Sequence, residues 1–132
     1  MDSLEWQKIM NIQDVLLIYE YNYWANKRIL AQCKNATLEQ FTAPAEFPFG
    51  GLRGTVVHIL DAEFGWRMFL QNNDWSAPEL KPEDFPTLDL IQKRWKKEEQ
   101  EFRAYLATLK AEDMHVHRIY DTPEGQHRDR VL

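Results

Sequence analysis

The sequence is short of cysteine, and this shortage excludes two kinds of cross-link. Cys33 is its one cysteine, so no disulfide can form within a chain and no four-cysteine metal site can exist in it. Such cysteine usage suits a reducing compartment, and we expect a cytoplasmic protein. The first ten residues carry acidic side chains instead of a basic flank and an apolar run, which is not the pattern of a signal peptide.

The chain also lacks long hydrophobic runs and an excess of positive charge. No stretch approaches the roughly 18 apolar residues that span a bilayer, so no membrane span is expected. The formal net charge is −5, and because phosphate backbones attract clustered Lys and Arg, nucleic acid is not expected as a partner. The basic residues within 93–97 are followed at once by Glu98, Glu99 and Glu101. This mixture indicates a solvated helix face.

Aromatic residues, in contrast, are plentiful. Five Trp, five Tyr and seven Phe occur in 132 residues, a length that fits one domain over residues 1–132. Aromatic side chains contribute large buried areas and serve a core or a ligand pocket equally well. Composition therefore predicts a globular protein without choosing between these two uses.

The first part of the chain has helical periodicity. Residues 12–33 repeat apolar side chains near helical spacing, and Asn11 with Asp14 provides an N-terminal cap and an acid in the first turn. Thr37 and Gln40 have the spacing of a capping box, which predicts one short extra turn over residues 38–41. We therefore expect one long helix followed by a single helical turn.

Two further long helices are expected. Residues 52–71 show two apolar rows, one containing Val57 and Leu60 and the other His58 and Trp66, and both rows are predicted to be buried. The prolines of residues 72–86 predict a loop without helix that crosses the end of a bundle. The third helix is expected to follow Thr87 as its cap and to continue to about residue 110. It is expected to bury an apolar row that consists of Ile91, Trp95, Phe102, Tyr105 or Leu106, and Leu109.

The C-terminal part changes character. Residues 122–125, TPEG, form a turn signal between two short strands, which predicts a β-hairpin near the C-terminus. Residues 129–132 are expected to begin another helix. The three long helices have broad apolar faces, and three helices alone would leave more apolar surface exposed than a monomer usually tolerates. A fourth helix or a second copy of the chain, in a homodimer, is expected to cover it.

Two segments resemble a known family. Residues 21–28, YNYWANKR, resemble the signature of the first helix in DinB-like proteins. Residues 49–63, FGGLRGTVVHILDAE, followed by Trp66, resemble the start of that family's second helix, and the turn at Gly125 matches the segment before its fourth helix. The match extends from about residue 12 to the end of the chain.

The resemblance implies an all-α, up-down four-helix bundle that binds one divalent metal ion, Zn, Ni or Fe. The ligands would be one His of the second helix and a His-x-x-x-His pair of the fourth, and His58 occupies the first of these positions. The other two are not in this sequence, so we expect the fourth helix to be missing or only begun and the chain to be truncated. Members similar to it include thiol-dependent S-transferases, which implies a small-molecule or thiol substrate.

His58 can also be interpreted without a metal. On the helix it is expected to point into the bundle, where a lone histidine is more often a core residue bonded to a neighbour. Asp61, one turn later, is either a hydrogen-bond acceptor for a metal-bound histidine or an exposed helix acid. Tyr21, Trp24 and Trp66 are candidates for a pocket above the metal, although core packing explains them equally well.

Other candidates are weaker. His115 and His117 have the spacing that places two imidazoles on one side of a strand, although a polar edge strand also accounts for them. His127 lies near the predicted turn and is expected to be exposed. Cys33 is expected to be a buried apolar residue and not a nucleophile, because the C-terminal end of a helix disfavours a thiolate. The two functions that remain are a metal-dependent transferase or hydrolase-like enzyme, inactive in this form, and a non-catalytic helical interaction or regulatory module.

Overall fold

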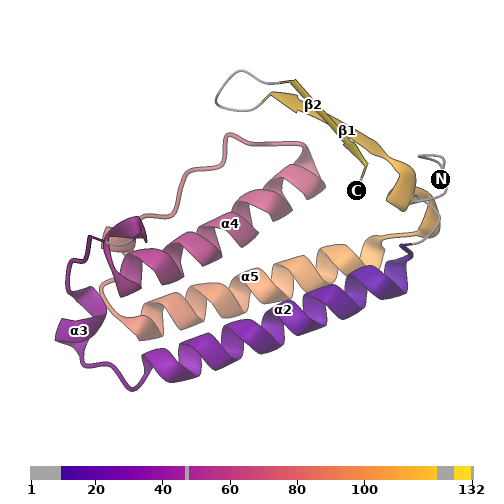
Figure 1. The fold of residues 1–132 in the computed structure, drawn as a ribbon. Helices are drawn as coiled ribbons and strands as arrows, with labels where there is room; N and C mark the ends of the chain where they lie inside the picture. The colour runs from indigo at the N-terminus through magenta and orange to yellow at the C-terminus, as the bar shows by residue number, and fades with distance from the viewer. Residues whose placement is uncertain (1–9, 47, 122–126, 132) are drawn as a thin grey trace.

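The computed structural model describes residues 10–46, 48–121 and 127–131, with side chains up to Val116. Three long helices lie alongside one another: α2 (Ile12–Cys33), α4 (Leu52–Asn72) and α5 (Leu88–Thr108) (Figure 1). The short helix α3 (Leu38–Thr42) joins α2 to α4 through a 3-10 turn at Pro48–Gly50. Two antiparallel strands, β1 (His117–Asp121) and β2 (His127–Val131), follow α5.

Local sequence fixes where α2 and α3 begin. The Asp14 amide donates to Asn11 Oδ1 at 3.0 Å while the Asn11 amide donates to Asp14 Oδ2 at 2.9 Å. The same reciprocal pair joins Thr37 and Gln40 at the start of α3. Each capping box satisfies amides that the first helical turn leaves without partners. The caps predicted at Asn11 and Thr37 are confirmed, and Thr87 is the N-cap residue of α5, although its side chain makes no capping hydrogen bond.

The long helices do not alternate in direction. Trp95 bonds to Glu63 and Glu98 bonds to Arg67, so position along α5 increases with position along α4, and these two helices are parallel. Contacts between α2 and α5 run the opposite way, because Lys27 approaches Glu99 whereas Glu20 pairs with Arg103. The up-down order expected from the resemblance therefore fails at the connection between α4 and α5.

That connection runs back along α4 and does not cross the end of the bundle. Its Trp75 stacks on Phe69 near the end of α4, with ring centroids 4.6 Å apart. Further on, the Leu80 amide donates to Asp61 Oδ1 at 2.8 Å, in the middle of α4. The loop also contains a 3-10 turn at Pro82–Asp84, so the prediction that it holds no helix is wrong. These side contacts determine the direction in which α5 begins.

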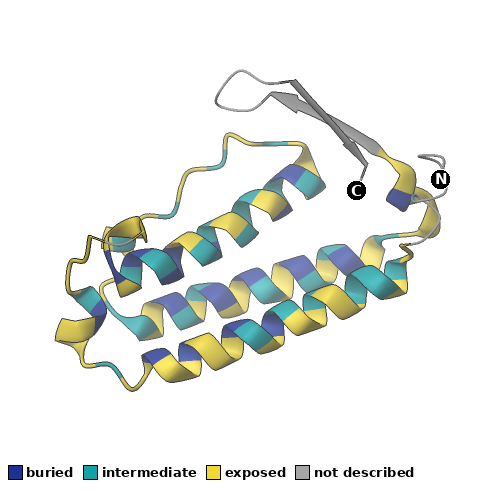
Figure 2. Ribbon diagram, viewed as in Figure 1, coloured by how far each residue is buried: buried dark blue, intermediate teal, exposed yellow. Residues whose placement is uncertain are grey.

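The main core lies where α4 meets α5 and the ends of α2 and α3. Leu60 and Ile91 are fully buried members of it. Figure 2 shows buried residues recurring along α4 and α5. The other buried members of this cluster are Leu30, Cys33, Phe41, Val56, Val57, Phe85 and Trp95. The apolar row predicted for α5 is confirmed: Ile91, Trp95, Phe102 and Leu106 are buried, and Leu109 at its end is half-buried. Of the two rows predicted for α4, the one with Val57 and Leu60 is buried, whereas His58 and Trp66 of the other are exposed.

Glu98 corrects the interpretation of the charged stretch on α5. Its side chain is fully buried, and it pairs with Arg67 Nε at 2.5 Å and with Arg94 Nη1 at 3.1 Å. A solvated face was expected here. Glu98 lies three residues after Trp95 and four before Phe102, on the apolar row itself, and two arginines provide the partners that a buried carboxylate requires.

The prediction of a missing fourth helix is not supported. The described residues contain four α-helices, because the capping box at Thr37 makes the extra turn a short helix, α3. The expected helix start at residues 129–132 is also wrong over 129–131, because these residues pair with β1 in β2, with Ile119 opposite Asp129. The turn predicted over residues 122–125 lies outside the described residues. None of the described helices has the length and apolar character needed to cross a membrane.

Candidate functional site

The carboxylate of Glu63 joins the three long helices. Its Oε1 accepts hydrogen bonds from Asn22 Nδ2 at 2.8 Å and from Asn26 Nδ2 at 2.6 Å, both on α2. Its Oε2 accepts from Trp95 Nε1 of α5 at 2.8 Å. One side chain of α4 therefore binds three neutral donors from the two neighbouring helices. An arrangement of this kind fixes the relative register of the helices.

The two segments that carry the family resemblance meet at this carboxylate. Asn22 and Asn26 belong to the first segment and Glu63 ends the second. Sequence reasoning assigned no role to Glu63. The signal that it missed is the spacing of Glu63, seven residues after Val56 and three after Leu60, which places it on the buried row of α4.

Glu63 also influences the two tyrosines of α2 that lie near it. Burial, with a smaller contribution from the negative charge of Glu63, raises the pKa of Tyr19 to about 12. The same causes raise the pKa of Tyr23. The Tyr23 ring is 2% exposed and lies beneath the Arg103 guanidinium, whose central carbon is 4.3 Å from the ring centroid. Its buried hydroxyl has no hydrogen-bond partner among the described residues.

His58 lies on the exposed surface of α4. Its ring stacks on Phe49, with ring centroids 3.7 Å apart and an angle of 13° between the planes. It makes no hydrogen bond within the part of the chain that has described side chains. The expectation that this imidazole points into the bundle is therefore wrong for the described residues, because α4 turns its other face toward α5.

A tight turn before α4 positions Phe49 against this ring. Phe49 has a φ of 62°, in the left-handed region, and its carbonyl oxygen occupies the space beside Gly54. A Cβ at position 54 would lie 1.7 Å from that oxygen, so only glycine fits. The Thr55 hydroxyl donates to the Gly51 carbonyl at 2.8 Å and anchors the start of the helix. The FGGLRGT segment thus forms the support on which the His58 ring rests.

Asp61 has a structural partner. Its carboxylate accepts the hydrogen bond from the Leu80 amide and so ties the return loop to α4. This contact explains the residue without a metal-bound histidine. His115 lies in a 3-10 turn after α5 and is exposed, and the side chains of His117 and His127 lie outside the described residues.

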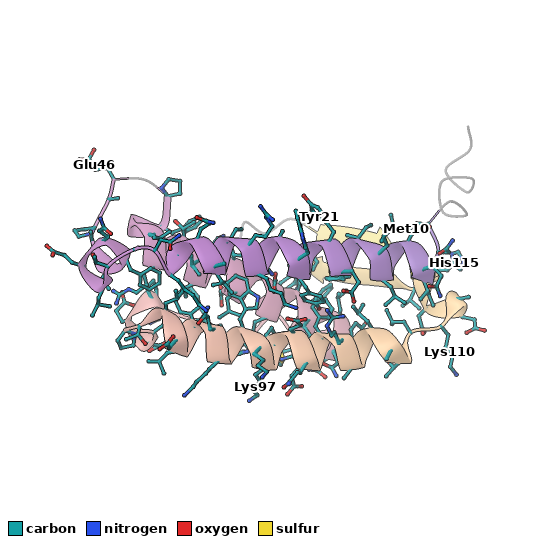
Figure 3. The ribbon with its side chains drawn as sticks, turned by 90° about the horizontal axis from the view of Figure 1, so that it is seen from below. Met10, Tyr21, Glu46, Lys97, Lys110 and His115 are labelled. Carbon is teal, nitrogen blue, oxygen red and sulfur yellow. The ribbon has the colours of Figure 1, made fainter. Side chains whose placement is uncertain are left out.

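The three aromatic residues proposed for a pocket do not form one group. Tyr21 and Trp24 lie together on the outer surface of α2, 67% and 54% exposed, with their ring centroids 5.5 Å apart. Tyr21 projects from the edge of α2 that faces away from α5 (Figure 3). Trp66 of α4 instead contacts Phe69 and Trp75. The ring contacts thus divide the three between two surfaces.

Cys33 is buried in the core cluster, as predicted. Burial raises the pKa of its thiol, which keeps it protonated and unreactive near neutral pH. No group of three or more His, Cys, Asp or Glu side chains that could hold a metal ion occurs among residues with described side chains. A stable site needs about three protein ligands. His58 therefore supplies one donor to an arrangement that the described residues do not complete.

Comparison with known proteins identifies the family. The model of the DinB family matches residues 10–131, which include α2, α3, α4 and α5 as well as both segments that meet at Glu63. The chain belongs to the DinB family. Neither the curated proteins nor the solved structures give a significant match.

Proposed function

We propose that this DinB-family protein binds a divalent metal ion, Zn, Ni or Fe, with His58 as one ligand. The observation that supports this proposal is that the His58 imidazole is exposed and makes no hydrogen bond within the described residues. A histidine that stabilises a core is normally buried and bonded to a neighbour. Stacking on Phe49 holds the ring while its nitrogens remain available.

The proposal requires donors besides His58. Because the described residues contain no group of three potential ligands, the remaining donors come from residues outside the described part or from a second copy of the chain. In this family we expect them to be histidines. The reaction class that we propose is thiol-dependent S-transfer or a hydrolase-like reaction on a small molecule, for which the described residues define no substrate.

The test is metal content in matched histidine variants. The protein is produced from its parent gene, so that any residues beyond Leu132 are retained, and is dialysed before elemental analysis. Wild type and His115→Ala should each hold about one equivalent of metal, whereas His58→Ala should hold less than about a tenth. His115 is a suitable control because it is also an exposed histidine.

Two results would contradict this proposal. Absence of metal from all three proteins after refolding in Zn, Ni or Fe would refute metal binding. Loss of metal in His115→Ala with retention in His58→Ala would assign the site to the pair His115 and His117 instead. Far-UV circular dichroism should show that all three proteins have the same helix content.

A second candidate function is a non-catalytic interaction module that forms a homodimer. The observation in its favour is the apolar surface of α2, where Leu17, Tyr21 and Trp24 are all more than half exposed. In sedimentation equilibrium, Trp24→Glu should weaken self-association and Lys97→Glu, on the opposite edge of α5, should not. A wild-type chain that stays monomeric at about 100 μM, far above typical Kd values of specific dimers, would exclude this function.

A further inference from the structure

A cleft of about 550 Å³ lies between α2 and α5, and none of the residues proposed for the metal site lines it. Its volume falls within the roughly 300–1,000 Å³ of small-molecule sites. The two helices run side by side (Figure 3), and the cleft is lined by residues within 23–34 and within 92–103. The metal proposal makes no use of this part of the molecule.

The floor of the cleft is apolar and rigid. Leu30 and Trp95 form part of it, and both are buried core residues. The Trp95 indole is fixed by its hydrogen bond to Glu63, so the floor keeps its shape. Ala31, an exposed small residue of α2, leaves space above this floor. A flat apolar group can therefore lie against the floor without moving the backbone.

The rim of the cleft is cationic in a chain whose net charge is −5. Four cationic side chains line it, and Glu99 is its one acid. Arg103 is neutralised by Glu20 and Glu99, and Lys27 approaches Glu99 at 3.9 Å. Lys34 and Lys96 form no ion pair with any described residue. Two positive charges on opposite walls are thus available to a ligand.

Polar groups in the cleft also lack partners. The Tyr23 hydroxyl is buried and has no hydrogen bond among the described residues. Asn26 uses its amide nitrogen on Glu63, and its oxygen accepts no hydrogen bond from the described part of the chain. Lysines on a helix are ordinarily solvated and indicate nothing alone. Here they border a concave apolar floor next to unpaired polar groups, as in a ligand site.

The geometry points to a binding site for a small organic acid, with an aromatic body against Trp95 and Leu30 and a carboxylate between Lys34 and Lys96. A carboxylate suits the cleft better than a phosphate dianion, because Glu99 also lines it and repels a second negative charge. This site is independent of the metal proposal, and its test is done in the presence of a chelator.

The test measures the binding affinity of the 132-residue chain for 2-naphthoate by isothermal titration calorimetry. The control ligand is 2-naphthamide, which is neutral and has nearly the same shape. Replacing both lysines, Lys34→Gln with Lys96→Gln, should weaken naphthoate binding roughly five- to tenfold, because each exposed ion pair contributes little. Lys93→Gln with Lys97→Gln is the matched control, since these exposed lysines of α5 do not line the cleft. It should leave the affinity unchanged.

A variant that fills the cleft tests whether naphthoate binds there. Ala31→Trp should fill the cleft and abolish saturable binding, whereas Ala104→Trp, also exposed and on α5, should not. The inference is overturned if naphthoate does not saturate, if naphthamide binds equally well, or if both lysine pairs weaken binding equally. It is also overturned if Trp24→Ser removes binding and Ala31→Trp does not, because the ligand would then lie on the outer surface of α2.

Discussion

Replacing Glu63 by glutamine tests whether its carboxylate joins the three helices. A glutamine side chain offers one oxygen and one NH₂ group. If the glutamine oxygen still accepts the hydrogen bonds of the two asparagine amides, its NH₂ group faces the Trp95 N–H. Two hydrogen-bond donors then face each other without an acceptor. Trp95 is 4% exposed, so its N–H has little access to water that could replace the lost acceptor. If the glutamine amide is instead rotated so that its oxygen accepts from Trp95, both asparagine side chains lose their hydrogen-bond acceptor.

The magnitude follows from this geometry. A buried donor without a partner costs about 1–3 kcal/mol, so Glu63→Gln should lower the free energy of unfolding by about 2 kcal/mol. Such a loss is a large fraction of a typical stability of roughly 5–15 kcal/mol. Urea unfolding followed by circular dichroism measures this loss. An unchanged m-value would show that unfolding exposes a similar surface area in both proteins.

A double-mutant cycle supplies the control. Trp95→Phe removes the donor that Glu63→Gln leaves unpaired. It should therefore lower the free energy of unfolding by less in the Glu63→Gln protein than in wild type. The expected coupling is about 1 kcal/mol or more. A loss below about 0.5 kcal/mol for Glu63→Gln, or strict additivity with Trp95→Phe, would refute the joining role, because surface changes have effects of that size.

Three further predictions concern other parts of the molecule. Gly54→Ala should destabilise the fold by about 2 kcal/mol or more in thermal unfolding, because its Cβ collides with the Phe49 carbonyl; an unchanged Tm would contradict this geometry. Glu98→Ala should lower stability by about 3 kcal/mol by leaving Arg67 buried without its carboxylate, whereas Glu98→Leu combined with Arg67→Met should recover most of the loss; equal losses in both variants would refute the pairing argument. Folded Tyr19 has a pKa of about 12, whereas its unfolded value is near 10; the stability that its neutral form provides is therefore complete below pH 10 and is lost as the pH rises toward 12. In alkaline unfolding, Tyr19→Phe should shift the midpoint to higher pH, and an unchanged midpoint would contradict the raised pKa.

Local features of the fold could be predicted from the sequence. The capping boxes at Asn11 and Thr37 involve residues three apart, so short-range chemistry determines them. The burial of Trp95 followed from its place on an apolar row, and Cys33 was expected to be buried as a small apolar residue. The family resemblance also found the two segments that the structure brings together at Glu63.

The features that sequence reasoning missed depend on long-range contacts. The half-buried Glu63 and the buried Glu98 are both held by partners more than 30 positions away in sequence, such as Arg67 for Glu98. A helical periodicity gives the apolar rows of α4 but not which of them faces α5, and therefore His58 was expected to be buried. The direction of α5 depends on the bond between Leu80 and Asp61, which no local pattern indicates.

The connection between α4 and α5 runs back along α4, and it therefore has a minimum length. With 21 residues, α4 is about 31 Å long at roughly 1.5 Å per residue. Residues 73–87 can reach about 50 Å when fully extended, at roughly 3.3 Å per residue. Losing more than about five of them would leave too little chain to reach the far end of the helix. In such a shortened protein α5 would have to begin beside Phe69, and Trp95 could no longer reach Glu63.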